Sequence, residues 1–120
     1  MSGAKSSVTD SYIPERGDFA RMVLDPYTGR EKGGERPVLV LSTRAFNVAT
    51  RYALVAPITR TVRDWPFELP VGPGARVSGV VLADQTRSVD FAARHARFLA
   101  KAPAELVVQV LACVCSIIEG

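Results

Sequence analysis

Residues 36–42 have the sequence RPVLVLS, in which an unbroken apolar run, Val38-Leu39-Val40-Leu41, lies between Pro37 and Ser42. Four consecutive apolar residues bounded in this way are typical of a short strand that is buried.

Short strands are expected on both sides of this run. Before it, residues 19–24 alternate well enough for a strand, and Asp25-Pro26 begins a turn. After it, one helical turn over residues 43–49 is expected to precede further strands. The expected strands cover residues 19–24, 38–41, 52–58, 67–69, 77–82 and 86–91. Many short strands joined by tight turns predict a small barrel or a sandwich.

The last segment of the chain has the pattern of a helix. Pro103 fits the first helical position, Glu105 fits the first turn, and the helix is expected to end near Ile118. Apolar residues cover roughly 200° of its helical wheel, more than the ~100° stripe that one packing face requires. A second subunit is the simplest candidate for covering the apolar residues outside that stripe. Cys113 and Cys115 are expected to be small buried apolar residues rather than a redox or metal pair.

The bulk composition is that of one ordinary globular domain. With 120 residues, 48% of them hydrophobic and 22% charged, the chain is long enough to form a core. Residues 1–11 are polar, and we expect a disordered tail there, followed by a single domain over residues 12–120. No apolar run reaches the roughly 18 residues that span a bilayer, and no signal peptide is recognised, so the expected location is the cytoplasm, away from membranes.

The basic residues are concentrated in one third of the chain. The formal net charge is +3, but residues 30–63 contain seven Lys or Arg side chains against two Glu. This imbalance predicts a polyanionic partner such as nucleic acid, although a merely solvated basic surface gives the same pattern.

The inventory of reactive side chains excludes several kinds of catalyst. His95 is the only histidine, so a two-histidine ribonuclease mechanism is excluded, and its basic surroundings favour a surface position. No His and Cys cluster has zinc spacing and no phosphate-binding or dinucleotide motif occurs, so neither a metal nor a cofactor is expected. The remaining candidate is the charged, glycine-rich loop 29–37, where Glu31 lies among bases. By itself, this loop is equally typical of an ordinary charged hairpin.

Several blocks of sequence together resemble the MazF/PemK/Kid family of toxins, over about residues 12–118. The blocks, in order, are Ile13-Pro14 with Arg16-Gly17-Asp18, Asp25-Pro26, residues 29–42, Ala56-Pro57-Ile58-Thr59, Trp65-Pro66-Phe67-Glu68 and residues 78–90. The resemblance implies a mainly β fold with α, namely an SH3-like small barrel of the PemK/CcdB kind with a C-terminal helix, built as a homodimer.

The resemblance also implies a set of site residues. Arg36 and Thr59 match the family's usual catalytic pair, and Glu31 matches a glutamate implicated in some members. Lys32 stands where the family commonly has glutamine, which makes the loop more basic. The candidate RNA-binding residues are Lys32, Arg30, Arg60, Gln85 and Arg87. For Asp84 and Arg87, a structural pairing near the barrel rim is the alternative to an RNA contact, and for Trp65 and Phe67 packing is the alternative to base stacking.

The function implied by this resemblance is that of the toxin of a type II toxin–antitoxin system. The protein is expected to cut single-stranded RNA at short sequence motifs without a metal, leaving 2′,3′-cyclic phosphate and 5′-hydroxyl ends, and to be inhibited by a cognate antitoxin. Two alternatives stay open. One is a gyrase poison of the CcdB type, and the other is a cleavage-inactive module that binds RNA or antitoxin.

Overall fold

The structure is a computed structural model that describes residues 12–24 and 34–120. The tail expected over residues 1–11 lies outside the described residues. The strands are β1 (Asp18–Val23), β2 (Glu35–Val40), β3 (Tyr52–Thr59), β4 (Glu68–Pro70), β5 (Val80–Leu82), β6 (Arg87–Asp90) and β7 (Arg97–Lys101). The helices are α2 (Arg44–Thr50), the 3-10 turn η2 (Ala83–Gln85) and α3 (Ala104–Glu119).

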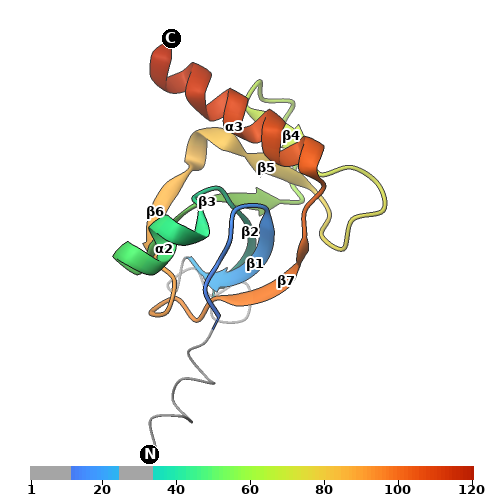
Figure 1. Cartoon of the computed structure of the whole chain (residues 1–120). Coiled ribbons are helices and arrows are strands. Elements are labelled where there is room, and N and C mark those ends of the chain that lie inside the picture. The colour runs from blue at the N-terminus through green and yellow to red at the C-terminus, as the bar shows by residue number, and fades with distance from the viewer. Residues whose placement is uncertain (1–11, 25–33) are drawn as a thin grey trace, which may run out of the picture.

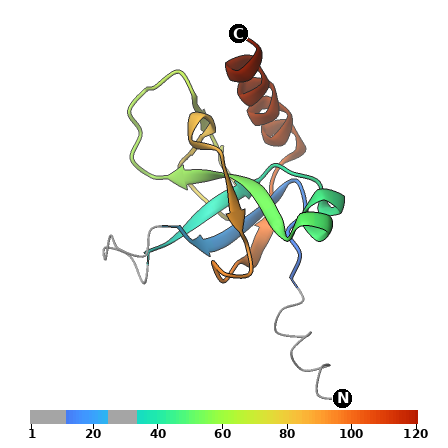
Figure 2. The same cartoon turned by 90° about the vertical axis from the view of Figure 1, so that its left-hand side faces the viewer.

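The strands curl into a small antiparallel barrel (Figures 1 and 2). Their order is β4-β5-β3-β2-β1-β7, with β6 paired to β3 off this path. The long strand β3 pairs with three strands. One of them is β2; in addition, the first half of β3 pairs with β6 and its end, Ile58 and Thr59, pairs with β5. The small barrel with a C-terminal helix that the sequence predicts is therefore confirmed.

The apolar run of β2 is continuous because both faces of the strand are buried. Leu39 packs with Phe19 and Ile58 in one core cluster, whereas Val38 and Val40 pack in a second cluster. The second cluster lies on the other face of the strand, because successive side chains of a strand point to opposite faces. A strand buried on both sides loses the usual polar alternation, which explains the pattern of residues 38–41.

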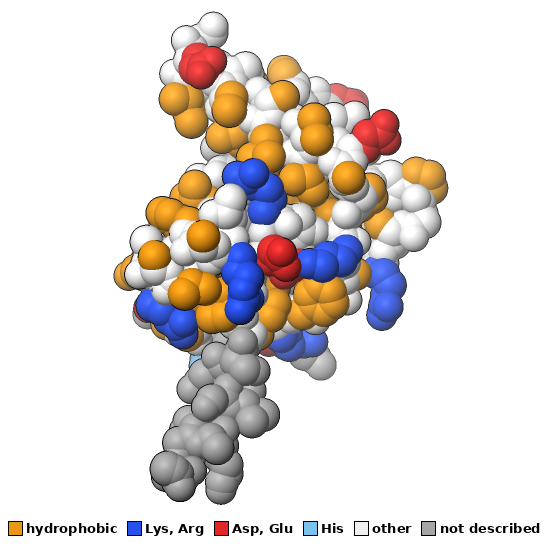
Figure 3. All heavy atoms as spheres, in the orientation of Figure 1, with side chains coloured by type: hydrophobic (Ala, Val, Ile, Leu, Met, Phe, Trp, Pro, Cys, Tyr) orange, Lys and Arg blue, Asp and Glu red, His pale blue; other side chains and the backbone are white. Residues whose placement is uncertain are grey.

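Helix α3 lies across one end of the barrel. Leu106, Val107 and Val110 are buried in the first core cluster, and the C-terminal end of the helix extends past the strands (Figures 1 and 2). Pro103 is the N-cap in extended conformation, so the helix begins at Ala104, one position later than predicted. The barrel itself thus covers part of the wide apolar arc. Val108, Ile117 and Ile118 stay exposed, and apolar side chains gather over α3 in Figure 3.

Three strands differ from the sequence-based expectation. β2 begins at Glu35 rather than Val38, so Arg36 lies in a strand and not in a loop. β5 begins at Val80 rather than Val77, because Gly79 has a left-handed φ of 119° that interrupts the extended backbone. β7 was not predicted. Among the described residues, β7 pairs with β1 at the end of the strand order, and none of its residues is fully buried, so its sequence lacks the alternation of a half-buried strand.

A buried carboxylate ties the start of the described chain to β7. Asp18 is 2% exposed. Its carboxylate accepts hydrogen bonds from the Tyr12 hydroxyl at 2.8 Å and from the Lys101 ammonium at 2.7 Å. It also accepts one from the backbone N–H of Glu15 at 3.1 Å. With three donors, the charge is compensated as a buried carboxylate requires.

Candidate active site

Arg36 is the second residue of β2 and is held by the pairing of β2 with β1. β2 follows directly after the segment 25–33. The two ends of that segment meet, since the backbone N–H of Leu24 donates to the Gly34 carbonyl at 3.2 Å. The guanidinium of Arg94 also donates to the Leu24 carbonyl, at 3.0 Å. The backbone on both sides of residues 25–33 is therefore anchored, and Arg36 lies two residues after Gly34.

Thr59 is the last residue of β3 and pairs with Val80 of β5. Its hydroxyl oxygen accepts a hydrogen bond from the backbone N–H of Thr61 at 3.1 Å. A hydroxyl that accepts one bond keeps its own O–H to donate. This turn therefore fixes the oxygen of Thr59 while leaving its proton available for a ligand.

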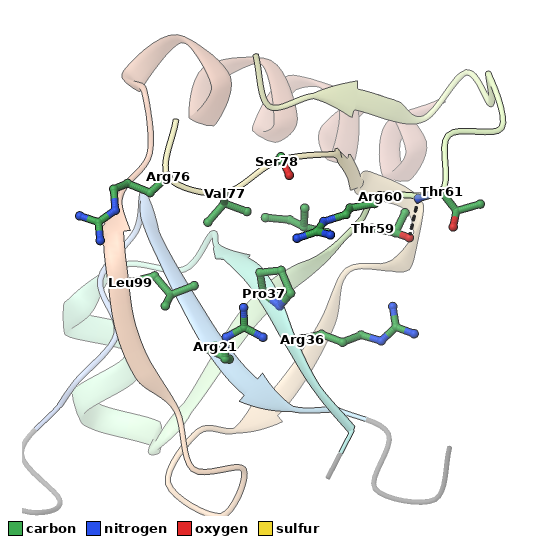
Figure 4. A pocket seen from close by; sticks show the side chains of 11 residues that line it. Arg21, Arg36, Pro37, Thr59, Arg60, Thr61, Arg76, Val77, Ser78 and Leu99 are labelled. Atoms are coloured by element: carbon green, nitrogen blue, oxygen red, sulfur yellow. Dashed lines mark hydrogen bonds between the residues drawn. The ribbon is translucent and has the colours of Figure 1, made fainter. Parts of the chain in front are cut away.

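Arg36 and Thr59 line one concave pocket with a volume of about 500 Å³. The residues around it are Arg21, Arg36, Pro37, Ile58, Thr59, Arg60, Thr61, Arg76, Val77, Ser78 and Leu99. Four of these side chains are arginines and none is acidic, so the pocket has a strongly positive potential. In Figure 4 the guanidinium groups of Arg21 and Arg60 extend toward its middle from different elements. Planar guanidinium donors and a hydroxyl suit a phosphate group.

Two of the four arginines are not in the basic third of the sequence. Arg21 comes from β1, directly opposite Pro37 of β2, and Arg76 comes from the segment before β5. Sequence reasoning missed both. Arg21 lies between apolar residues of a strand, a pattern that tells which face of the strand it is on but not which residues of other strands lie beside it. Arg76 lies in a loop, where the sequence has no periodic pattern.

Comparison with known proteins identifies the family of this chain. The profile of a family described as "PemK-like, MazF-like toxin of type II toxin-antitoxin system" matches residues 15–118. The chain belongs to the PemK/MazF toxin family. It is 39% identical to the endoribonuclease PemK of Escherichia coli, over 81% of this chain and 76% of that protein. It is also 39% identical to the endoribonuclease toxin MazF of Escherichia coli strain K12, over 71% and 76%.

Solved structures confirm the fold of this PemK/MazF toxin. The crystal structure of MazE-MazF (Form-III) from Deinococcus radiodurans superimposes with a TM-score of 0.81 and 38% identity, covering 89% of this chain and 97% of that one. The MazF (Form-I) structure from the same organism also gives 0.81 with 38% identity, over 91% and 99%. These matches favour the PemK/MazF assignment over the CcdB alternative.

The other site residues predicted for the toxin divide into three groups. Arg60 lines the pocket beside Thr59. Gln85 and Arg87 are exposed on η2 and β6 and are not brought to the pocket. Glu31, Lys32 and Arg30 lie outside the described residues.

The expected pairing of Asp84 with Arg87 does not occur in the described ranges. Instead, the carboxylate of Asp84 accepts a hydrogen bond from the indole of Trp65 at 3.3 Å. The ring of Trp65 packs edge-on against Phe67, with 5.9 Å between the ring centroids. Trp65 is nevertheless 52% exposed, so packing within one subunit covers only half of it.

Neither a metal cluster nor a membrane span is found in the part of the toxin that the structure describes. Within residues 12–24 and 34–120, no three His, Cys, Asp or Glu side chains are placed to hold an ion. No helix in the same ranges is long and apolar enough to cross a bilayer.

His95 is exposed, as its surroundings predicted. Burial raises the pKa of the Cys113 thiol. Cys113 is only half-buried and Cys115 is exposed, so the prediction that both are buried is wrong for Cys115 and only partly met for Cys113.

Proposed function

We propose that this toxin is an endoribonuclease that binds single-stranded RNA in the Arg36–Thr59 pocket and cuts it at short sequence motifs without a metal ion. The observation that carries the proposal is the pocket itself, in which arginines from separate elements and the Thr59 hydroxyl surround one space with no acidic lining residue. A phosphodiester brings the negative charge that such a site lacks.

RNA brings its own nucleophile, because a 2′-hydroxyl lies beside each phosphate. The chain then needs to stabilise charge on the phosphoryl oxygens, accept the 2′-proton and supply a proton to the leaving 5′-oxygen. The products are a 2′,3′-cyclic phosphate and a 5′-hydroxyl. Arginine side chains stay charged in proteins and make poor bases, so Arg36 is assigned to the developing charge. Thr59 donates its hydroxyl proton as a hydrogen bond to the same phosphoryl group.

The proposed proton acceptor is Glu31. It lies three residues before Gly34 in the sequence and matches the glutamate implicated in some members of the family. No described lining residue is acidic, which leaves the neighbouring loop or a water molecule as the acceptor. A Glu31→Gln variant that binds RNA normally but cuts it slowly supports this role, and unchanged cutting assigns the proton to water.

The proposed partners are a cognate antitoxin and a second copy of the chain, and the proposed place of action is the cytoplasm. The antitoxin follows from the likeness to the MazE-MazF complex of Deinococcus radiodurans. The second copy follows from the apolar side chains of α3 that the barrel leaves exposed, among them Val108 and Ile118.

The test is cleavage of one long RNA by the purified protein in EDTA. We expect fragments with 5′-hydroxyl ends, which a ligase that requires a 5′-phosphate does not join. Arg36→Ala protein purified in parallel controls for contaminating ribonuclease. Activity that is lost in EDTA and restored by magnesium overturns the metal-free mechanism. No cleavage under any condition supports the cleavage-inactive alternative.

A further inference from the structure

The pocket continues well beyond the two residues assigned to the scissile phosphate. In Figure 4, Arg36 and Thr59 lie toward one end, and Leu99 and Arg76 lie toward the other. Arg21 lies between the two ends, next to Pro37. The volume of about 500 Å³ falls in the range of about 300–1,000 Å³ typical of sites for small molecules, more than one phosphate group needs.

No described residue compensates the positive charge of the Arg21 side chain. This side chain makes no hydrogen bond or ion pair with any residue in the described ranges, 12–24 and 34–120. Its two neighbours across the sheet are Pro37 on β2 and Arg97 on β7. Like charges directly opposite each other on adjacent strands destabilise a sheet. A half-buried arginine in the interior strand β1, facing a second arginine, is therefore explained by an anionic ligand rather than by stability.

Arg76 lies at the other side of the space and, unlike Arg21, is exposed. It also has no hydrogen bond or ion pair within the part of the chain that the structure describes, and it follows a loop that includes Gly72 and Gly74. Beside it, Val77 and Leu99 add apolar surface, and Ser78 adds a hydroxyl. Apolar surface next to planar guanidinium groups is what an unpaired nucleobase stacks on, and the charges suit its phosphate.

We propose that Arg21, Arg76, Val77 and Leu99 form a second nucleotide subsite of the pocket. It binds the nucleotide that adjoins the scissile phosphate on one side of the same RNA strand. Arg76 pairs with the phosphate of that nucleotide, and Arg21 and Leu99 contact its base. This inference rests on the proposed function, because the scissile phosphate defines where the neighbouring nucleotide lies.

The experiment compares RNAs of different length around one mapped cleavage motif. One RNA has several nucleotides on both sides of the cut, and two others are shortened to the cut nucleotide on one side or the other. The variants are Arg21→Gln and Arg76→Gln, each checked for folding by thermal melting. Arg44→Gln is the matched control, because Arg44 is exposed on α2 and outside the pocket, and its loss removes the same charge.

On the long RNA, both pocket variants should raise KM about tenfold or more, with kcat at saturation nearly unchanged, since they lose charge-assisted bonds to a group that does not react. On one of the two shortened RNAs, both variants should match the wild type. The subsite is overturned if the effect persists on both shortened RNAs, or if Arg44→Gln raises KM equally. If the wild type cuts the long RNA and the variants are unimpaired, only the subsite is wrong. If the wild type cuts no RNA, the proposed function itself fails.

Discussion

Gly79 lies directly against the peptide of Thr59. A Cβ atom added at Gly79 would be 2.2 Å from the Thr59 carbonyl oxygen, 2.8 Å from its carbonyl carbon and 3.3 Å from the Cα of Arg60. Atoms do not approach so closely, so any side chain at this position displaces the end of β3. The position of Thr59 and Arg60 in the pocket therefore depends on the absence of a side chain on the neighbouring strand.

We expect Gly79→Ala to lower RNA cleavage about tenfold or more, because Thr59 moves away from the phosphoryl group. Gly72→Ala is the matched control. Its φ of 95° is also left-handed, against 119° at Gly79, but nothing lies within 4 Å of the added Cβ. Both variants lose about 1 kcal/mol of stability from backbone strain. Urea unfolding measures the loss of stability, and the cleavage rate measures the displacement of Thr59. Equal cleavage rates for both variants would show that the contact with Thr59 has no role.

Arg36→Ala should lower the cleavage rate by about 100-fold or more, the scale seen when a preorganised donor to a transition state is removed. Arg36→Lys should recover little, because an ammonium keeps the charge but not the planar fork. Single-turnover cleavage, with RNA affinity measured separately, is the test. A lysine variant as fast as the wild type would reduce the role of Arg36 to charge alone.

Thr59→Val should also slow cleavage, because valine matches the shape of threonine but has no hydroxyl to donate. Thr59→Ser is the control, since serine keeps both the donor and the bond accepted from the Thr61 N–H. We expect serine to retain most of the activity and valine to lose it, with little change in melting temperature for either. Equal activity of the two variants would remove the hydroxyl from the mechanism.

The cluster around Asp18 predicts a loss of stability in alkali. Burial and the hydrogen bond to Asp18 raise the pKa of Tyr12 above its ordinary 10.0, and the bond to Asp18 raises the pKa of Lys101 above 10.5. The folded state thus holds both protons more tightly than the unfolded state. The contribution of these two groups to the free energy of unfolding is complete below pH 10. It is lost as the pH rises toward their pKa values in the folded state.

Tyr12→Phe tests this linkage. At pH 7 the variant should be less stable by about 1.5 kcal/mol, because a hydrogen bond to a charged group is lost. Above about pH 10 its stability should fall less steeply than that of the wild type, because the tyrosine no longer titrates on unfolding. Urea unfolding across this pH range gives both slopes, and identical slopes would contradict the role of Tyr12.

The exposed apolar residues of α3 predict a homodimer. Ile118 is 77% exposed and Val108 is 65% exposed. Ile118→Glu or Val108→Glu should shift the protein toward monomer, whereas Gln109→Glu places the same charge at an exposed polar position of the helix and should not. Val110 is unsuitable for this test, because it is fully buried in the core of its own subunit. Light scattering at micromolar concentration measures the outcome, and a folded wild-type monomer would refute the proposal.

The sequence by itself indicated those strands and helices whose residue pattern lies within one short segment of the chain. The apolar run Val38–Leu41 and the amphipathic pattern after Pro103 report burial directly, because one period or one unbroken run identifies a buried strand or a helix. The motif blocks likewise identified Arg36 and Thr59, which the fold then brings to one pocket from two strands.

Only the tertiary structure decided what depends on contacts between distant segments. Arg21 reaches the pocket because β1 pairs with β2 in one particular register, and Arg76 because the segment before β5 returns to that side. A two-residue period tells which residues share a face but not which strand lies opposite. The need for glycine at position 79 is equally non-local, since the reason is the backbone of Thr59, twenty residues earlier in the chain.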